Sequence, residues 1–135
     1  MIGIVVVSHA GLADELLHAA ELILGPLQAV AAVSISREMS LEVAKEELQK
    51  AVNLVGKDGT GTIILTDLFG GTPTNISVDF LLEGSVEILT GVNLPMLIKG
   101  VSARLDKSLD VLAALLKEYA QNAIMRPSEL LNSAQ

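Results

Sequence analysis

The sequence predicts an α/β fold, an open and mostly parallel sheet with helices on both faces. Four short apolar, β-branched runs alternate with longer segments of helical period, which favours strands joined by crossover helices. Hydrophobic residues make up 50% of the chain but aromatic residues only 2%, so the core is aliphatic, as in strands buried on both faces. We expect a single domain over residues 1–125 and a C-terminal tail over 126–135.

The first half of the chain supplies two strand–helix units. Residues 2–7 form a continuous apolar run that predicts a buried strand. A helix is expected over 11–24, because apolar residues recur on one face and the Gly25-Pro26 pair ends the pattern. Residues 30–35 predict the second strand, and a second helix capped by Ser40 runs to about residue 55.

The second half repeats the alternation twice. Residues 62–66 predict the third strand, and the helix after it is expected to end near Leu82. Residues 86–90 predict the fourth strand, followed by helices over 93–104 and 107–121. The short apolar stretch 123–125 is either an antiparallel edge strand or a frayed end.

Two distant residues are expected to meet at one crevice. A doubly wound sheet of this size commonly has the strand order 2-1-3-4, and sites form where the order reverses, beyond the carboxyl ends of the strands. His9 follows the first strand and Asp67 the third. Imidazole is a good nucleophile near neutral pH, and a carboxylate that accepts a hydrogen bond from Nδ1–H leaves Nε2 to attack. The pair predicts histidine phosphorylation.

The loop after Asp67 predicts an anion-binding segment. Gly70 and Gly71 allow close backbone approach, and the proline at position 73 suits the first turn of a helix whose free N–H groups favour phosphate. Thr72 adds a hydroxyl donor, and Ser8 is expected to do the same from the opposite wall.

Composition excludes several classes of function. The net charge of −7 and the lack of a Lys/Arg cluster disfavour nucleic acid and anionic membranes. No apolar run approaches the roughly 20 residues that span a bilayer, and no signal peptide is evident, so we expect a cytoplasmic protein. With two histidines and no cysteine, neither a metal site nor a cofactor is expected.

Some residues allow two interpretations. Arg37 either contacts phosphate or a partner, or is an ordinary surface residue. Asn93, Leu94 and Pro95 either line a partner surface or only start a helix. His18 is expected on a solvated helix face. Two other uses of the crevice are disfavoured: a receiver phosphorylated on Asp67 lacks an acidic pair after the first strand, and a serine hydrolase lacks a nucleophile elbow.

Three segments carry a family resemblance: 7–13 (VSHAGLA), 66–75 (TDLFGGTPTN) and 90–97 (TGVNLPML). Their order and spacing resemble the enzyme IIA component of the mannose family of the sugar phosphotransferase system, over about residues 2–122. The resemblance implies a phosphotransferase that takes phosphate from the carrier protein HPr onto His9 and passes it to a IIB component, with Asp67 orienting the ring and Thr72 near the phosphate.

The resemblance also implies a homodimer in which a C-terminal edge strand is exchanged, for which residues 123–125 are the candidate. Many family members carry a fused IIB domain, and none follows in this sequence, so a separate IIB protein is expected. Two related roles stay open: a regulatory phosphorylation sensor, and a subunit that serves dihydroxyacetone kinase.

Overall fold

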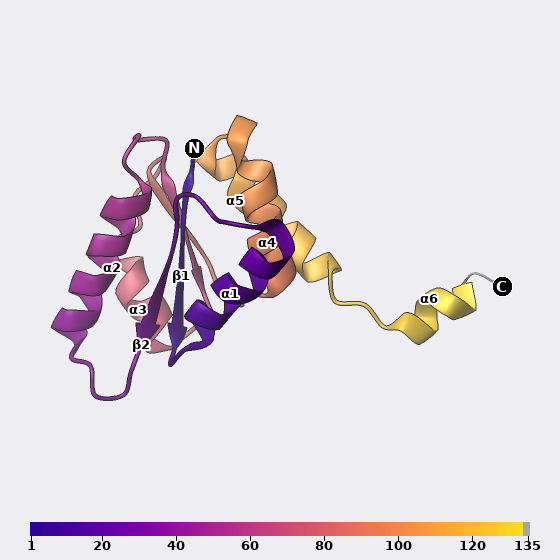
Figure 1. Cartoon of the computed structure of the whole chain (residues 1–135), viewed down its shortest axis with the longest axis horizontal. Helices are drawn as coiled ribbons and strands as arrows, with labels where there is room; N and C mark the ends of the chain where they lie inside the picture. Colours follow the sequence, from indigo (N-terminus) through magenta and orange to yellow (C-terminus); the bar gives the residue numbers. More distant parts are fainter. Residues whose placement is uncertain (134–135) are drawn as a thin grey trace.

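A computed structural model of the chain, which describes residues 1–133, confirms the predicted sheet. Four parallel strands lie in the order β2-β1-β3-β4, with β1 and β3 at the centre (Figure 1). Their bounds are β1 (Gly3–His9), β2 (Val30–Ile35), β3 (Thr62–Thr66) and β4 (Val86–Leu89). The order reverses between β1 and β3, where the site is expected at their carboxyl ends.

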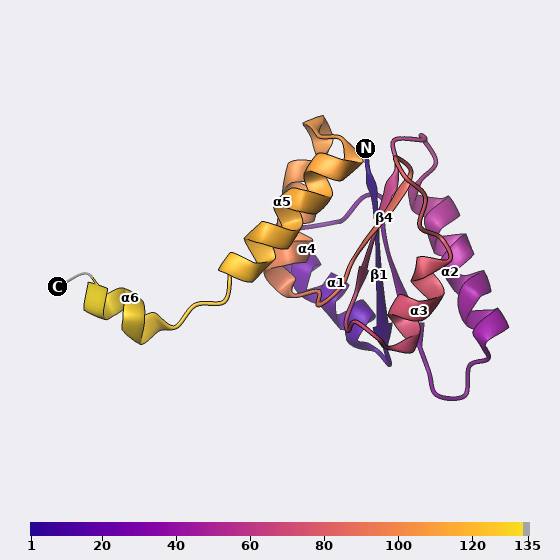
Figure 2. The same ribbon diagram turned by 180° about the vertical axis from the view of Figure 1, so that it is seen from behind.

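Helices cover both faces of the sheet (Figures 1 and 2). On one face lie α1 (Leu12–Leu24), α4 (Leu94–Ala103) and α5 (Leu109–Asn122), and on the other lie α2 (Leu41–Val55) and α3 (Thr72–Val78). A 3₁₀ turn, η1 (Arg104–Asp106), joins α4 to α5. Among residues 1–133, no helix has both the length and the apolar character needed to cross a membrane.

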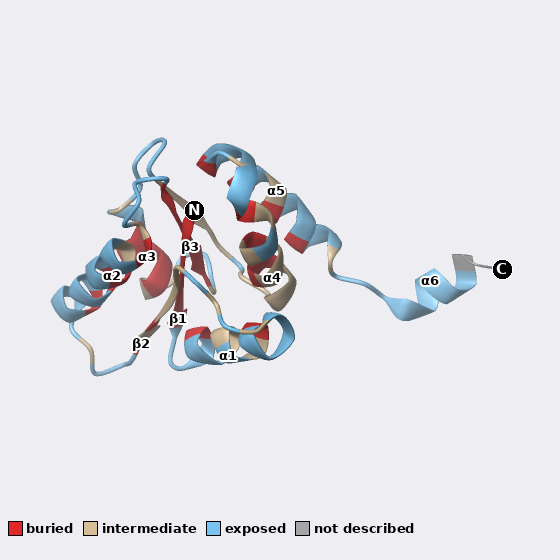
Figure 3. Ribbon diagram, turned by 45° about the horizontal axis from the view of Figure 1, so that its top comes forward, coloured by how far each residue is buried: buried red, intermediate tan, exposed pale blue. Residues whose placement is uncertain are grey.

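The central strand β1 divides the core into two clusters. Ile4 and Val6 pack with α1, α4 and α5, whereas Val5 and Val7 pack with α2 and α3. All four side chains are fully buried, and the buried central strands stand out in Figure 3. Since both faces are covered, β-branched residues fill positions 4–7 of the strand.

The third helix is shorter than the sequence predicts, and the boundary near Leu82 is wrong. α3 ends at Val78. The hydroxyl of Ser77 donates to the carbonyl of Pro73 (2.6 Å), and the chain then turns tightly, with the amide of Phe80 donating to the carbonyl of Ser77 (2.9 Å). Such local bonds compete with helix propagation.

In the single chain, residues 123–125 do not form a strand, and their exchange between subunits stays a prediction. Within residues 1–133, Ala123 ends α5, Ile124 is 81% exposed, and a linker leads to α6 (Pro127–Ser133). α6 stands away from the body of the protein (Figures 1 and 3). β3 is the only strand that pairs with β4 in this part of the chain; Leu82 forms an isolated antiparallel bridge with Val86 at the start of the outer edge, and no strand covers the edge beyond it.

A buried arginine ties together the amino end of the sheet. Arg104 is 3% exposed, and its Nη1 donates to the carbonyls of Ile2 and Ala29 (3.2 Å each), while Nη2 donates to that of Gln28. Burial lowers the pKa of the guanidinium, which still stays protonated because its ordinary pKa is so high. Ala29 itself has a left-handed backbone (φ +51°).

Candidate active site

The register of the sheet places His9 beside Asp67. Val7 of β1 pairs with Thr66 of β3, and the amide of Asp67 donates to the carbonyl of Val7 (3.2 Å). His9 is therefore the last residue of β1 and Asp67 the first residue after the adjacent strand β3, although 58 positions separate them in sequence. The structure brings together the pair that the topology predicts.

One carboxylate oxygen holds both the backbone and the ring of His9. Oδ2 of Asp67 accepts from the His9 amide (2.8 Å) and lies 2.9 Å from Nδ1 of the ring. An ionised carboxylate only accepts hydrogen bonds, so the ring proton of neutral His9 belongs on Nδ1 and the lone pair on Nε2. The Asp67 side chain is 11% exposed and the His9 side chain 50%, which leaves Nε2 reachable from solvent.

The second oxygen of Asp67, Oδ1, is buried and has no hydrogen-bond partner in the described part of the chain. The hydrogen bonds of this carboxylate are therefore concentrated on His9. A carboxylate in this position stabilises positive charge that grows on the ring when Nε2 forms a bond.

The ring of His9 lies against Gly71. A Cβ atom at position 71 would lie 2.6 Å from ring Cε1, closer than real Cβ atoms come, and 3.1 Å from Nε2, which is tighter than most real contacts. Gly70 has a positive φ of +90°, which favours glycine, and a Cβ there would meet nothing within 4 Å. Glycine is thus required at the two positions for different reasons: at position 71 it leaves room for the ring, and at position 70 it adopts the positive φ of the turn.

His9 and Thr72 line one hollow of about 660 Å³. Its other wall is the segment that connects β2 to α2 and the start of α2, and the remaining lining residues are Ala10, Ile35, Ser36, Arg37, Glu38, Met39 and Leu41. Ala10 has a left-handed backbone (φ +49°), a conformation that alanine rarely adopts, directly after the histidine. The hollow therefore borders the His9 ring on one side.

Two buried threonines anchor the glycine loop, and the sequence reasoning missed them. The hydroxyls of Thr66 and Thr74 lie 2.6 Å apart, and that of Thr74 donates to the carbonyl of Leu68 (2.7 Å). This chain of bonds ties the end of β3 to α3 and brackets Asp67. A threonine on each side of the Gly-Gly pair was the available signal.

Ser8 does not face the hollow. It is fully buried, and its hydroxyl accepts from the amide of Ala13 (2.7 Å) and donates to the carbonyl of Ala10 (3.2 Å). The expected phosphate contact is corrected accordingly: the hydroxyl fixes the turn into α1, where the N-cap residue, Gly11, has no side chain to do so.

Asn93 caps α4, and Leu94 and Pro95 begin it, apart from the residues of the hollow; their role at a partner surface stays a prediction. Oδ1 of Asn93 accepts from the amide of Met96 (2.9 Å), its Nδ2 donates to the carbonyl of Ala120 (3.2 Å), and Leu94 packs on the core. Asn93 lines a different groove, of about 490 Å³, between β4 and α5. Residues 1–133 contain no cluster of three or more His, Asp or Glu side chains that could hold a metal.

A family model matches most of the chain. The model described as "PTS system fructose IIA component" matches residues 3–117. Among curated proteins, the chain is 32% identical over 126 residues to the mannose-specific EIIAB component of the phosphotransferase system of Escherichia coli strain K12. The match covers 91% of this chain but only 38% of that protein, so the chain spans well under half of it. The fructose-specific EIIA component of Bacillus subtilis is 26% identical, over 100% of this chain and 92% of its own.

Solved structures give the same result. A phosphotransferase system component EIIA from Streptococcus agalactiae superposes with a TM-score of 0.85 at 30% identity, covering 96% of this chain and 99% of its own. A mannose/sorbose-specific IIA subunit from Enterococcus faecalis superposes with a TM-score of 0.81 at 28% identity, covering 93% of each chain. The order of the elements and the open sheet are shared across these chains.

Proposed function

This chain belongs to the family of IIA components of the sugar phosphotransferase system, and we propose that it is a phosphocarrier in sugar uptake whose His9 accepts a phosphoryl group from HPr and passes it to a IIB component. One observation supports the proposal most directly. Asp67 binds the Nδ1 edge of the His9 ring, while the Nε2 edge lies by Gly71 and the hollow.

The proposed reaction is an in-line transfer between two imidazoles. Nε2 of His9 forms a bond to phosphorus as the nitrogen–phosphorus bond of the donor breaks, and the donor ring leaves with that electron pair. The proton on Nδ1 stays hydrogen-bonded to Asp67, which offsets the charge on the ring. We assign the phosphate oxygens to the loop of Gly70 and Gly71 and to the hydroxyl of Thr72. Transfer to the IIB component reverses the same step.

Phosphorylation in vitro tests the proposal, and the chain offers a matched control. Its second histidine, His18, lies on α1 with a side chain 66% exposed and contacts only Glu15 (3.3 Å). With phosphoenolpyruvate, enzyme I and HPr, wild type and His18→Ala should each gain one acid-labile, alkali-stable phosphoryl group, and His9→Ala should gain none. An unlabelled wild type, or label on His9→Ala, would reject the proposal.

We extend the proposal to a homodimer. No strand covers the outer edge of β4 beyond the Leu82–Val86 bridge, and Ile124 of the C-terminal segment lines the groove beside Ile88 and Leu89 of that strand. An open edge with apolar residues beside it favours pairing with another strand. Light scattering on the full chain should give twice its mass of 14.2 kDa. A mass of one chain at every concentration would reject the dimer.

A further inference from the structure

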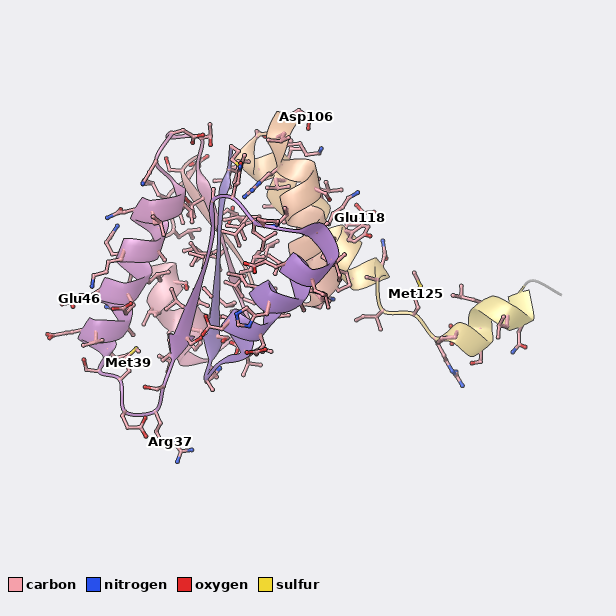
Figure 4. All side chains as sticks on the ribbon, in the orientation of Figure 1. Arg37, Met39, Glu46, Asp106, Glu118 and Met125 are labelled. Carbon is pink, nitrogen blue, oxygen red and sulfur yellow. The ribbon has the colours of Figure 1, made fainter. Side chains whose placement is uncertain are left out.

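The hollow beside His9 contains one cationic side chain, that of Arg37. It lies between β2 and α2, is exposed, and makes no ion pair in the part of the chain that the structure describes. Figure 4 shows Arg37 extending from this loop into solvent, with Met39 on the side toward α2. An unpaired guanidinium in the wall of a candidate phosphoryl site is available to bind an anion there.

Most other cations of the chain are already engaged. Their partners are Asp79 for Lys45, Glu47 for Lys50, the Tyr119 ring for Lys99, three carbonyls for Arg104, Asp106 for Lys107 and Glu129 for Arg126. Lys117 lines the other groove, and Lys57 lies in the turn before β3, at the amino end of the sheet. Arg37 is therefore the cation available at the His9 end.

The sheet register puts the loop that carries Arg37 beside His9. His9 pairs with Ile35 across β1 and β2, and the amide of Ala10 donates to the carbonyl of Ile35 (2.9 Å). Arg37 follows Ile35 by two residues, and its long side chain can turn from solvent over the hollow. An anion bound at Nε2 would give the guanidinium the partner it lacks.

We propose that Arg37 binds the phosphoryl group during its transfer to Nε2 of His9, which makes it a catalytic residue of the proposed phosphocarrier. The inference rests on that proposed function. As the donor nitrogen–phosphorus bond breaks and the Nε2–phosphorus bond forms, the guanidinium donates hydrogen bonds to the equatorial oxygens and keeps its proton. Its planar fork suits two oxygens at once.

Local charge makes this contribution necessary. The chain carries a net charge of −7, and the hollow also holds the carboxylate of Glu38, next to Arg37. Both repel an incoming phosphoryl group. Arg37 offsets that repulsion where the charge is concentrated, in a site whose neutral donors are glycine amides and the hydroxyl of Thr72.

Single-turnover transfer from phospho-HPr separates the inference from its alternatives. At saturating donor, Arg37→Ala should lower the maximal rate about 100-fold, the usual size for loss of a transition-state donor, and Arg37→Lys should recover part of it. Glu38→Gln should raise the rate. Lys57→Ala, which removes the same charge at the far end of the sheet, should stay within about twofold of wild type.

Each other outcome has a definite meaning. If Arg37→Ala changes only the donor concentration at half-maximal rate, Arg37 serves docking and the inference is overturned. If His9 labels normally and the Arg37→Ala rate equals that of wild type, the inference fails while the proposed function stands. If wild type is not labelled on His9, both fail.

Discussion

The two ends of the sheet use a polar side chain in opposite ways. At the amino end, Arg104 is 3% exposed, and its guanidinium donates hydrogen bonds to three backbone carbonyls. At the carboxyl end, the His9 side chain is 50% exposed, and one ring nitrogen is held while the other is free. Each end also has an alanine in the left-handed region, Ala29 and Ala10 respectively.

The contrast separates stability from chemistry. Arg104 closes the loops on which the strands begin, and its hydrogen bonds serve the fold. The side-chain hydrogen bonds of His9 and Asp67 join these two residues, and the half-exposed ring lies against Gly71, so their removal should cost the fold little and the reaction much. The predictions below test this division, beginning with the largest effect.

Arg104→Met should destabilise the fold without slowing phosphorylation. Methionine keeps an apolar stem but leaves the carbonyls of Ile2 and Gln28 without their donors, at a cost of about 3 kcal/mol. Urea unfolding measures the loss, and labelling of the folded protein should proceed at the wild-type rate. An unchanged urea midpoint would mean that the free energy lost in burying the charge equals the free energy gained from its hydrogen bonds.

Asp67→Asn should do the opposite. The amide keeps the shape but not the charge that balances the ring, so we expect roughly a 10- to 100-fold slower phosphorylation, equivalent to about 1.5–3 kcal/mol. The urea midpoint should hardly move. Asp106→Asn, which removes an exposed carboxylate at the amino end, is the control and should label normally. Equal rates for both variants would refute the role given to Asp67.

Substitutions of the two neighbouring glycines of the loop should separate an effect on the labelling rate from an effect on stability. Gly71→Ala pushes a methyl group into the ring of His9 and should slow labelling about tenfold, equivalent to about 1.4 kcal/mol, with little loss of stability. Gly70→Ala strains the backbone by about 1–2 kcal/mol and should lower the urea midpoint instead. The same phenotype from both would show that the loop responds as one unit.

The smallest effect concerns the left-handed alanines. Ala10→Gly and Ala29→Gly each relieve strain and loosen the unfolded chain, with a net gain of about 0.5–1 kcal/mol. Thermal unfolding should show similar gains for the two variants. Only Ala10→Gly, next to His9, should change the labelling rate. A changed rate in Ala29→Gly as well would contradict the separate roles of the two ends of the sheet.

Much of this arrangement could be predicted from sequence. Alternating strand and helix patterns favour the common order 2-1-3-4, which the structure confirms, and that order brings His9 to Asp67 because parallel strands end at a common edge. Ser40 was predicted as a helix cap, and its hydroxyl accepts from the amide of Val43 (3.2 Å). These features follow from local chemistry and topology alone.

The rest depends on tertiary contacts without a sequence signal. Ser8 and Thr72 are both hydroxyl residues near the site, and only the path of the chain decides that Ser8 turns inward. Arg104 is identified by the sequence only as the end of a helix, because its acceptors are backbone carbonyls. Ala10 and Ala29 are left-handed although alanine gives no hint of it.

The single free edge of the His9 ring limits how many partner proteins can bind at the site at once. With one nitrogen facing one hollow, the site can bind only one partner protein at a time, so the phosphoryl donor must dissociate before the acceptor docks. The proposed relay is therefore a ping-pong exchange in which the phosphorylated chain travels alone between its two partners. Initial rates measured at several concentrations of both should give parallel double-reciprocal lines, and intersecting lines would reveal a complex of all three.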